Sequence, residues 1–588
     1  MKETWKLINK VINRRKNKIT LIKKMKCPNG TSVTDQEQIC NILNCHFVTN
    51  GPNLAKNIPH STINPTSFLK NQVVKDSIFL SPTNDDEIAE LIDKLNPGKA
   101  CGPDGINASF IKHAKEVISP ILAKLINEGI LSGYFPECLK RALVVPIHKK
   151  GDKDSPDNYR PISLLPCISK IFEKVLYKRI LDFCKAQKIL SDQQFGFRKK
   201  HSTQHALSTL TNYLAEKLDD SETSIVVFLD LSKAFETVDH KILLNKLYYY
   251  GIRGLPLELI KSYLENRKQC VKCGNHFSTF LEVLCGVPQG SILGPLLFLL
   301  YVNDLPVIID HSSILFADDT SVLSSSKKIS TVFCDINAKL AKLNTWFICN
   351  KLTVNYSKTN YIIFSGNRSK SFNFNVTMGN NTLERVSSAK YLGIQFDENL
   401  NWKNHVSYLC KKISNCSNIM YKLRHFVPLA SCISVYYSLF YSKVSYGIVC
   451  WGSASNDVVN PVRVLQNRII RTMLFKPIDT RIKSLFHELQ LLNVKDLFQY
   501  EISKHVHKSL SKSLPCTFHS QYIYRNTATR SSSRNELIIN RTKKEIGKKS
   551  STIIGATVWN SIPHEMRSLD YKHFTRTYKD YLIDDYTE

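Results

Sequence analysis

The chain lacks an apolar run long enough to cross a bilayer. Its longest apolar stretch, Ile292 to Val302, is interrupted by Gly294-Pro295, whereas a membrane-spanning helix needs roughly 20 predominantly apolar residues. The first residues, Met-Lys-Glu-Thr-Trp-Lys, are polar and basic and lack the apolar core of a signal peptide. We therefore expect a protein of the cytoplasm and nucleus that has no membrane partner.

Acidic residues are scarce relative to basic ones. The 588 residues include 50 Asp+Glu and 80 Lys+Arg, a formal net charge of +30 at pH 7. A surplus of this size indicates a polyanionic partner, and it favours nucleic acid over an anionic membrane surface. A basic protein whose charge only maintains solubility is the less favoured alternative. The hydrophobic fraction of 43% is typical of a globular protein with real cores.

The 17 cysteines do not form a zinc-binding pattern. Cys270 and Cys273 form the only CxxC, and no second pair follows at zinc-finger spacing. We interpret them as strand cysteines that stay reduced inside the cell. The sequence contains no internal repeat.

Two adjacent aspartates, Asp318 and Asp319, lie between short apolar runs in segment 313–323. This pattern predicts two strands joined by a tight turn with paired negative charge at its tip. A solvated turn would explain an isolated pair. However, Asp230 follows the predicted buried strand Ser224–Leu229, and three carboxylates at one sheet edge can hold Mg²⁺, which prefers oxygen ligands. Such a cluster serves two-metal nucleotidyl transfer.

Two further residues are candidates for contact with a nucleotide. A bulky ring at Phe235, five residues after Asp230, could lie under the incoming sugar and exclude a 2′-hydroxyl; ordinary core packing is the alternative. Gln289 lies in the turn Gly286–Ser291 before the long apolar run. The flanking glycines let the backbone approach a ligand closely, and a simple helix-start loop is the alternative.

Lys149 and Arg160 lie on a predicted β-hairpin over residues 144–163. Both cations suit a triphosphate, and Arg can bind one bidentately. Taken alone, the segment would be interpreted as an ordinary charged surface hairpin.

Local signals predict several helices. N-cap candidates and acidic residues at Ser81–Glu87 indicate a helix that ends near Leu95. Val238 to Tyr250 is expected to be a helix closed by Gly251. Residues 400–475 are expected to be mostly helical and basic. A core-facing stripe at helical spacing comprises Phe172, Val175, Leu176 and Ile180.

Taken in order, the motifs closely resemble the reverse transcriptases of non-LTR (LINE-type) retrotransposons, most of all the jockey-like groups. Any one motif is moderate evidence, but the full ordered set is specific, and it covers about residues 80–480. The matching blocks are Gly102–Ile106, Tyr159–Leu165, Gln194–Arg198, Phe228–Phe235, Gly286–Pro295, Phe316–Asp319, Asn350–Leu352 with Asn355, Lys358 and Thr359, and Tyr391–Ile394.

The resemblance implies roles for particular residues. It implies that Asp230, Asp318 and Asp319 are catalytic and bind two Mg²⁺ ions, with Mn²⁺ as the alternative ion. Lys358 resembles the lysine proposed to protonate the leaving pyrophosphate, and a lysine beside a polyphosphate is a competent general acid. The implied nucleotide-binding residues are Lys149 and Arg160 at the triphosphate, Phe235 as the sugar gate, and Gln289 in the nucleotide pocket.

The implied fold is α+β, a right-hand polymerase with fingers, palm and thumb, an antiparallel palm sheet, and a helical C-terminal region. The expected division is a basic N-terminal linker region over 1–79, fingers over 80–220, a palm over 221–400, a helical thumb over 401–480, and a basic helical C-terminal region over 481–588.

The implied function is RNA-directed DNA polymerase, with an RNA template, a DNA primer or target, and deoxynucleoside triphosphates as partners. Group II intron maturases and telomerase-like polymerases share the palm, but the blocks at 350–359 and 391–394 favour the LINE type. A non-catalytic, nucleic-acid-binding relic of an element is the other alternative. Related elements usually encode an upstream endonuclease. Because no metal-nuclease cluster precedes residue 80, we expect nicking by a missing upstream domain or another chain. No zinc knuckle is found near the C-terminus.

Overall fold

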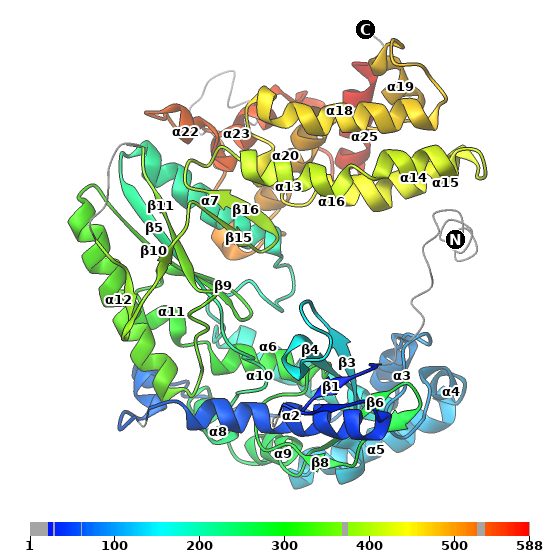
Figure 1. The fold of residues 1–588 in the computed structure, drawn as a ribbon, viewed down its shortest axis with the longest axis vertical. Helices are drawn as coiled ribbons and strands as arrows, with labels where there is room; N and C mark the ends of the chain where they lie inside the picture. The colour runs from blue at the N-terminus through cyan, green and yellow to red at the C-terminus, as the bar shows by residue number, and fades with distance from the viewer. Residues whose placement is uncertain (1–21, 28–29, 60, 367–373, 526–535, 587–588) are drawn as a thin grey trace.

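The computed structural model describes residues 22–27, 30–59, 61–366, 374–525 and 536–586. Two lobes are joined along one side by a central sheet (Figure 1). The lower lobe combines helices with a second sheet, and the upper lobe is made mainly of the C-terminal helices. The fold is therefore α+β, as the sequence predicts.

The central sheet has the strand order β14-β11-β5-β10-β9. β5 pairs antiparallel with both β10 and β11, β9 pairs antiparallel with β10, and the short edge strand β14 is parallel to β11. The strands are β5 (Thr223–Leu229), β9 (Ser313–Phe316), β10 (Asp319–Ser326), β11 (Asn360–Phe364) and β14 (Glu384–Arg385).

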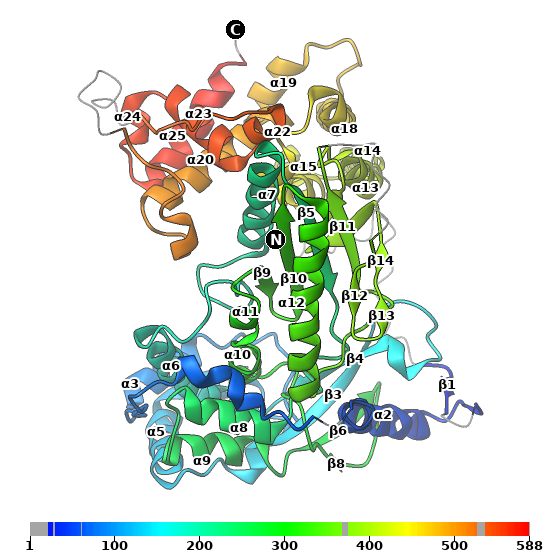
Figure 2. The same cartoon turned by 90° about the vertical axis from the view of Figure 1, so that its left-hand side faces the viewer.

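Alternation along β5 explains why this sheet is covered on both faces. Ile225, Val227 and Leu229 share a core with the long helix α12 (Ile329–Cys349), which Figure 2 shows running along the sheet. Val226 and Phe228 belong to a second core, with α7 (Thr203–Asp219). Because both faces are buried, β5 is a continuous apolar run, which confirms the predicted buried strand.

The second sheet carries the predicted hairpin. β3 (Arg141–His148) pairs antiparallel with β4 (Tyr159–Leu164) and parallel with β6 (Lys268–Cys273). The short strands β7 (His276–Phe277) and β8 (Leu281–Glu282) pair with β6. Cys270 and Cys273 lie buried in β6, so they are strand cysteines.

Helix α2 (Gln36–Lys56) packs against the second sheet. The buried amide of Asn44 donates hydrogen bonds to the carbonyl oxygens of Gln269 and Thr279, at 3.2 and 2.8 Å. Residues 36–56, which the sequence places in a linker region, thus form an integral helix of the lower lobe.

Three helices of the lower lobe, α3, α6 and α8, follow the predicted signals. Asn84 caps α3 by accepting from the backbone N–H of Glu87. The predicted helix at 238 begins two residues later, at His240, because the Asp239 side chain is the N-cap; Gly251 ends it at φ +87°. The stripe Phe172–Ile180 is buried on α6, as predicted. Together with their neighbours in the lobe, these helices are α3 (Asp85–Asp93), α4 (Ala108–His113), α5 (Lys115–Ser132), α6 (Cys167–Ala186), α8 (His240–Tyr249), α9 (Leu255–Leu264), α10 (Leu293–Tyr301) and α11 (Leu305–Ile308).

A fully buried ion pair ties α8 to the junction of α10 and α11. Lys246 Nζ lies 2.7 Å from Asp304 Oδ1, and both side chains are 0% exposed. Trp346 of α12 donates its indole N–H to Asp304 at 3.0 Å. Burial lowers the pKa of Lys246. The pair therefore joins three helices within the main hydrophobic core, including the one that backs the central sheet.

The upper lobe is built mainly of helices, as predicted for 400–475. A hairpin of β15 and β16 precedes them. The elements are β15 (Ser388–Tyr391), β16 (Ile394–Asp397), α13 (Lys403–Ile413), α14 (Cys416–Leu423), α15 (Leu429–Tyr436), α16 (Ser442–Val444), α17 (Ile448–Trp451), α18 (Asn456–Met473), α19 (Ile482–Glu488), α20 (Val494–Leu510), α22 (Glu545–Lys548), α23 (Ser551–Ser561), α24 (His564–Arg567) and α25 (Tyr571–Asp584).

Helix α7 connects the central sheet to this lobe. The carboxylate of Asp219 accepts from the backbone N–H groups of Lys543 and Lys544, at 3.0 and 2.7 Å. One hydrophobic core runs from Val226 of β5 through α7 to Trp559 and Phe574. The C-terminal helices are therefore part of the packing behind the central sheet.

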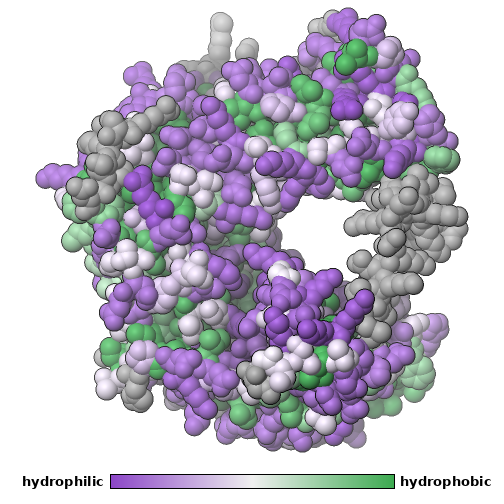
Figure 3. Space-filling view, in the orientation of Figure 1, coloured by the Kyte–Doolittle hydropathy of each residue, from purple (hydrophilic) through white to green (hydrophobic). Residues whose placement is uncertain are grey.

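An opening separates the two lobes (Figure 3), and its visible rims are mostly hydrophilic. The β3–β4 hairpin lies at its lower border in Figure 1, and α14 and α15 lie above it. No helix in the described part of the chain has the length and apolar character needed to traverse a bilayer.

Candidate active site

The structure brings the three predicted aspartates together. Asp230 directly follows β5, Asp318 lies in the β9–β10 turn, and Asp319 begins β10. Thr320 pairs with Leu229 in the sheet register, so Asp319 and Asp230 occupy the same end of two neighbouring strands. The predicted hairpin with paired negative charge at its tip is confirmed.

Burial, and after it repulsion between the carboxylates, dominates the electrostatics of this cluster. Burial raises the pKa of Asp319 to about 6, and the charges of Asp318 and Asp230 add to the shift. Burial, together with Asp230, also raises the pKa of Asp318. Carboxylates that disfavour their charged form gain when a cation joins them.

The donor set of the cluster fits a hard divalent cation. Its carboxylate oxygens are ligands that Mg²⁺ prefers, and Mg²⁺ usually takes only one or two carboxylates while water and substrate phosphates complete its shell. Among the described residues, no three His, Cys, Asp or Glu side chains are already arranged around a single point. Two or three carboxylates from the cluster would leave the rest of a Mg²⁺ shell to water and substrate oxygens.

The loop before β11 holds Asp230 in place. The backbone N–H of Asn355 donates to the carbonyl of Asp230 at 2.8 Å, and the Thr359 hydroxyl accepts from the Asp230 N–H at 3.3 Å. Lys358 Nζ lies 3.4 Å from Asp230 Oδ2. The predicted lysine thus joins the acidic cluster.

The hairpin cations act on the same cluster. Lys149 follows β3, and Arg160 lies opposite Ile147 on β4. The charge of Arg160 opposes the upward pKa shifts of Asp318 and Asp319. Burial, then Arg160, lowers the pKa of Lys149. Both cations therefore lie within electrostatic reach of the aspartates.

The turn with Gln289 packs between the hairpin and the segment after Asp230. The Gln289 backbone carbonyl accepts from Ser163 N–H at 2.8 Å, and its side-chain amide donates to Glu236 at 3.1 Å. Gly290 has φ +126°, and a Cβ there would lie 2.5 Å from the carbonyl oxygen of Ser163. Only glycine permits this close approach.

Phe235 is half-buried and held between two rings. It stacks on Phe298 of α10, with ring centroids 4.4 Å apart, and meets Phe197 edge-on at 5.9 Å. The packing fixes the orientation of the ring. Its role as a sugar gate stays a prediction.

Sequence reasoning missed several partners of these residues. Glu236 holds Gln289, and burial raises its pKa. Lys233 Nζ lies 3.2 Å from Asp157 Oδ1 and 3.3 Å from His46 Nε2, so it links the segment after Asp230 to the hairpin and α2. Lys233 stands in a recognised motif, but no local pattern reveals its distant partners.

Comparison with known proteins defines the class. Residues 147–396 match the family model described as reverse transcriptase (RNA-dependent DNA polymerase). The chain is 30% identical over 504 residues to "Probable RNA-directed DNA polymerase from transposon BS" of Drosophila melanogaster, covering 82% of this chain and 54% of that relative.

Two further relatives come from the same organism. The chain is 30% identical over 448 residues to "RNA-directed DNA polymerase from mobile element jockey". It is 31% identical over 450 residues to "Probable RNA-directed DNA polymerase from transposon X-element". Each match covers 74% of this chain and 48% of the relative. The chain belongs to the reverse transcriptases of non-LTR retrotransposons, and it spans about half the length of these relatives.

Replacing Asp319 with asparagine should stabilise the metal-free protein at neutral pH. In the folded state its pKa is raised from the usual 3.8 to about 6, so the folded state binds this proton more tightly and the wild type loses stability as pH rises from about 4 to about 6. The full shift corresponds to about 3 kcal/mol. Neighbouring atoms desolvate the carboxylate, but the residue as a whole is solvent-exposed, so solvent screening reduces this value to about 1 kcal/mol. Urea unfolding in EDTA at pH 4 and pH 8 measures the difference in free energy of unfolding between Asp319→Asn and the wild type.

The gain should be present at pH 8 and absent at pH 4. Asp182→Asn, which alters an exposed aspartate paired with Lys185 on α6, should change stability little at either pH. Equal gains for Asp319→Asn at both pH values would contradict the raised pKa of Asp319.

Proposed function

We propose that this chain is an RNA-directed DNA polymerase that extends a DNA 3′-end on an RNA template by two-metal nucleotidyl transfer. The observation that best supports this function is the convergence of Asp230, Asp318 and Asp319 at one sheet edge, within electrostatic reach of the hairpin cations. The membership of the chain in the reverse transcriptases agrees with it.

In this proposal the molecule is a right-hand polymerase. The fingers (80–220), palm (221–400) and thumb (401–480) surround the opening between the lobes. The basic helical region 481–588 packs behind the palm sheet through α7. The net charge of +30 suits binding of the phosphates of an RNA template and a DNA primer without reading their sequence.

The proposed mechanism assigns each site residue a task. Asp230, Asp318 and Asp319 would hold two Mg²⁺ ions, which when bound lower the pKa of the primer 3′-hydroxyl and neutralise the departing pyrophosphate. Lys149 and Arg160 grip the triphosphate from the hairpin. The remaining tasks fall to Gln289, which contacts the nucleotide from its glycine turn, and to Lys358, which gives a proton to the pyrophosphate.

Other partners belong to the proposal as well. The substrates are deoxynucleoside triphosphates, with Mn²⁺ able to replace Mg²⁺. The primer end in a target DNA would be made by a nicking activity on another domain or another chain.

Primer extension tests the function. The purified chain, given an RNA template, an annealed DNA primer, deoxynucleotides and Mg²⁺, should lengthen the primer to the end of the template, and EDTA should stop it. A relic would bind the primer–template in a gel-shift assay without extending it, and that result would overturn the proposal.

Phe235→Ala should weaken discrimination against ribonucleotides. Removing the ring opens space beneath the sugar, so the ratio of kcat/KM for dCTP to that for CTP should fall at least about tenfold, which corresponds to about 1.4 kcal/mol of lost selectivity. Single-nucleotide extension with each substrate measures the ratio. Phe110→Ala, at an exposed phenylalanine of α4, should leave it unchanged. An unaltered ratio in Phe235→Ala would identify the ring as a core aromatic only.

A further inference from the structure

The backbone just before Asp318 adopts an unusual conformation. Ala317 has φ +58°, which lies in the left-handed region that residues other than glycine rarely adopt. Such a residue persists only where its surroundings over-determine it. Its conformation sets the direction in which the next two residues, Asp318 and Asp319, leave the turn.

One side chain satisfies both backbone groups of Ala317. Gln194 is 4% exposed. Its Oε1 accepts from the N–H of Ala317 at 2.9 Å and from the N–H of Gly196 at 2.8 Å. Its Nε2 lies 3.5 Å from the carbonyl oxygen of Ala317, which it faces as a donor. The hairpin ladder cannot supply these bonds, because its last pair is Asp319 with Phe316.

The segment around Gln194 pairs with β9 on the edge opposite β10. Gln194 forms a parallel bridge with Leu315. Leu315 donates its N–H to the carbonyl of Gln193 at 2.9 Å and accepts from Phe195 N–H at 2.8 Å. A Cβ at Gly196 would overlap the backbone nitrogen of Ala317, so glycine is needed for this approach. The Gln194 segment therefore packs along β9 and against Ala317, on the side of β9 opposite β10.

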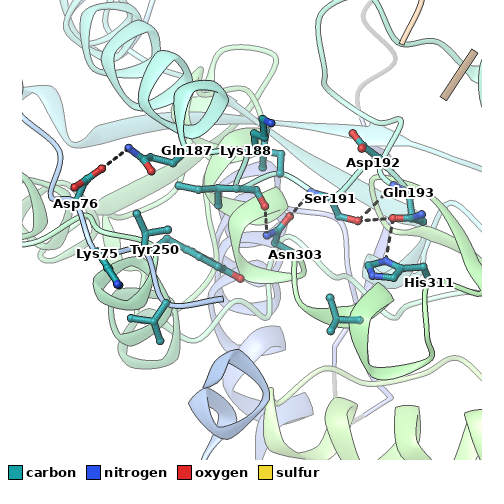
Figure 4. A pocket seen from close by; sticks show the side chains of 15 residues that line it. Lys75, Asp76, Gln187, Lys188, Ser191, Asp192, Gln193, Tyr250, Asn303 and His311 are labelled. Carbon is teal, nitrogen blue, oxygen red and sulfur yellow. Dashed lines mark hydrogen bonds between the residues drawn. The ribbon is translucent and has the colours of Figure 1, made fainter. Parts of the chain in front are cut away.

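The same segment is anchored before and after Gln194. The buried amide of Asn303 accepts from Ser191 N–H at 2.9 Å and donates to the carbonyl of Ile189 at 2.8 Å. Figure 4 shows Asn303 and Ser191 bonded beside a cavity of about 790 Å³ lined by residues 187–193. Downstream, Arg198 donates to the carbonyls of Ser191 and Gln194. The amide of Gln194 is therefore presented by a fixed backbone.

We propose that Gln194 is a positioning residue for catalysis: its amide holds Ala317 in the left-handed conformation and so aims the carboxylates of Asp318 and Asp319 at the metal ions. The side-chain hydrogen bonds of Gln194 in the turn go to the backbone of Ala317 and not to either carboxylate, so its effect passes through that backbone. This inference rests on the proposed function. The buried amide of Gln194 and the backbone of Ala317, on which it acts, are 123 residues apart in the sequence.

Gln194→Leu keeps the size of the side chain and removes both the acceptor and the donor. We expect kcat for primer extension to fall at least tenfold and the Mg²⁺ concentration for half-maximal rate to rise at least fivefold. The Kd for primer–template should stay within twofold of the wild-type value. Gln187→Leu is the matched control, since its amide bonds the exposed Asp76 upstream of the same segment, and it should match the wild type.

A second substitution separates positioning from general destabilisation. Adding Ala317→Gly to Gln194→Leu removes the steric preference against the left-handed region, so at least threefold of the lost rate should return. A loss of rate caused by damaged core packing would not be reversed by glycine at position 317. Should Gln194→Leu fail to fold, Gln194→Glu tests the same point, because it keeps the acceptor but turns a second oxygen towards the carbonyl of Ala317.

Binding of Mn²⁺ gives a readout that does not depend on turnover. Free Mn²⁺ is measured by electron paramagnetic resonance with wild-type protein, Gln194→Leu and Asp318→Ala. We expect Gln194→Leu to bind Mn²⁺ at least fivefold more weakly than the wild type. Wild-type protein that binds Mn²⁺ but extends no primer would sink the proposed function and leave the positioning role to be decided by this comparison. Wild-type Mn²⁺ affinity and kcat in Gln194→Leu would overturn the positioning role itself.

Discussion

Asp318→Ala should abolish RNA-templated DNA synthesis. The carboxylate lies in the β9–β10 turn beside Asp230 and Asp319, and its loss leaves two carboxylates to hold the metal ions. Metal stabilisation of transition-state charge is worth several kcal/mol. A loss of about 4 kcal/mol or more lowers the rate at least about 10³-fold.

Primer extension measures the effect, with wild-type protein and Asp318→Ala assayed separately and each in excess over the primer–template. Asp182→Ala, which removes an exposed carboxylate paired with Lys185, should extend primers at the wild-type rate. The unfolding midpoint of Asp318→Ala should equal or exceed that of the wild type, because a repelled, partly buried charge is removed. Synthesis at more than a tenth of the wild-type rate would refute the assigned mechanism.

Lys246→Met should destabilise the protein by about 3–5 kcal/mol. The substitution leaves Asp304 buried, with the Trp346 N–H as a remaining donor but without its counter-charge. Taking one partner from a buried pair costs more than the pair itself contributes, since an uncompensated charge stays in the core. Urea unfolding followed by tryptophan fluorescence measures the loss.

The matched control is Lys94→Met. Lys94 forms an exposed i,i+4 pair with Glu90, and such surface pairs contribute about 0.3–0.5 kcal/mol. The double variant Lys246→Met with Asp304→Leu should recover part of the loss, because no charge then remains buried. Equal destabilisation by Lys246→Met and Lys94→Met would show that the buried pair matters no more for stability than an exposed surface pair.

Features set by local sequence were the ones that could be predicted. The apolar run before Asp230 and the apolar runs around Asp318-Asp319 define strands by their own composition, and the meeting of the aspartates follows once those strands pair. The cap at Asn84 and the stop at Gly251 are likewise local. The start of α8 differs from the predicted start by two residues, because the Asp239 side chain caps the helix.

Features that depend on distant partners could not be predicted. Gln194 lies in a recognised motif, yet its role depends on a bond to Ala317 that the motif does not encode. Lys233 likewise meets His46 across 187 positions. The parallel pairing of β6 with β3, and the packing of α2 on that sheet, join segments that no periodicity connects.

The shared core around α7 has a genetic consequence. A stop codon or frameshift before codon 543 would remove the two backbone donors to Asp219 and the aromatic side chains of Trp559 and Phe574. Such an allele would keep Asp230, Asp318 and Asp319, but helix α7, which covers one face of their sheet, would lose the side chains that pack against its other side. The packing behind the sheet that carries the aspartates thus depends on residues far downstream of them, and intact aspartate codons alone do not identify an intact fold.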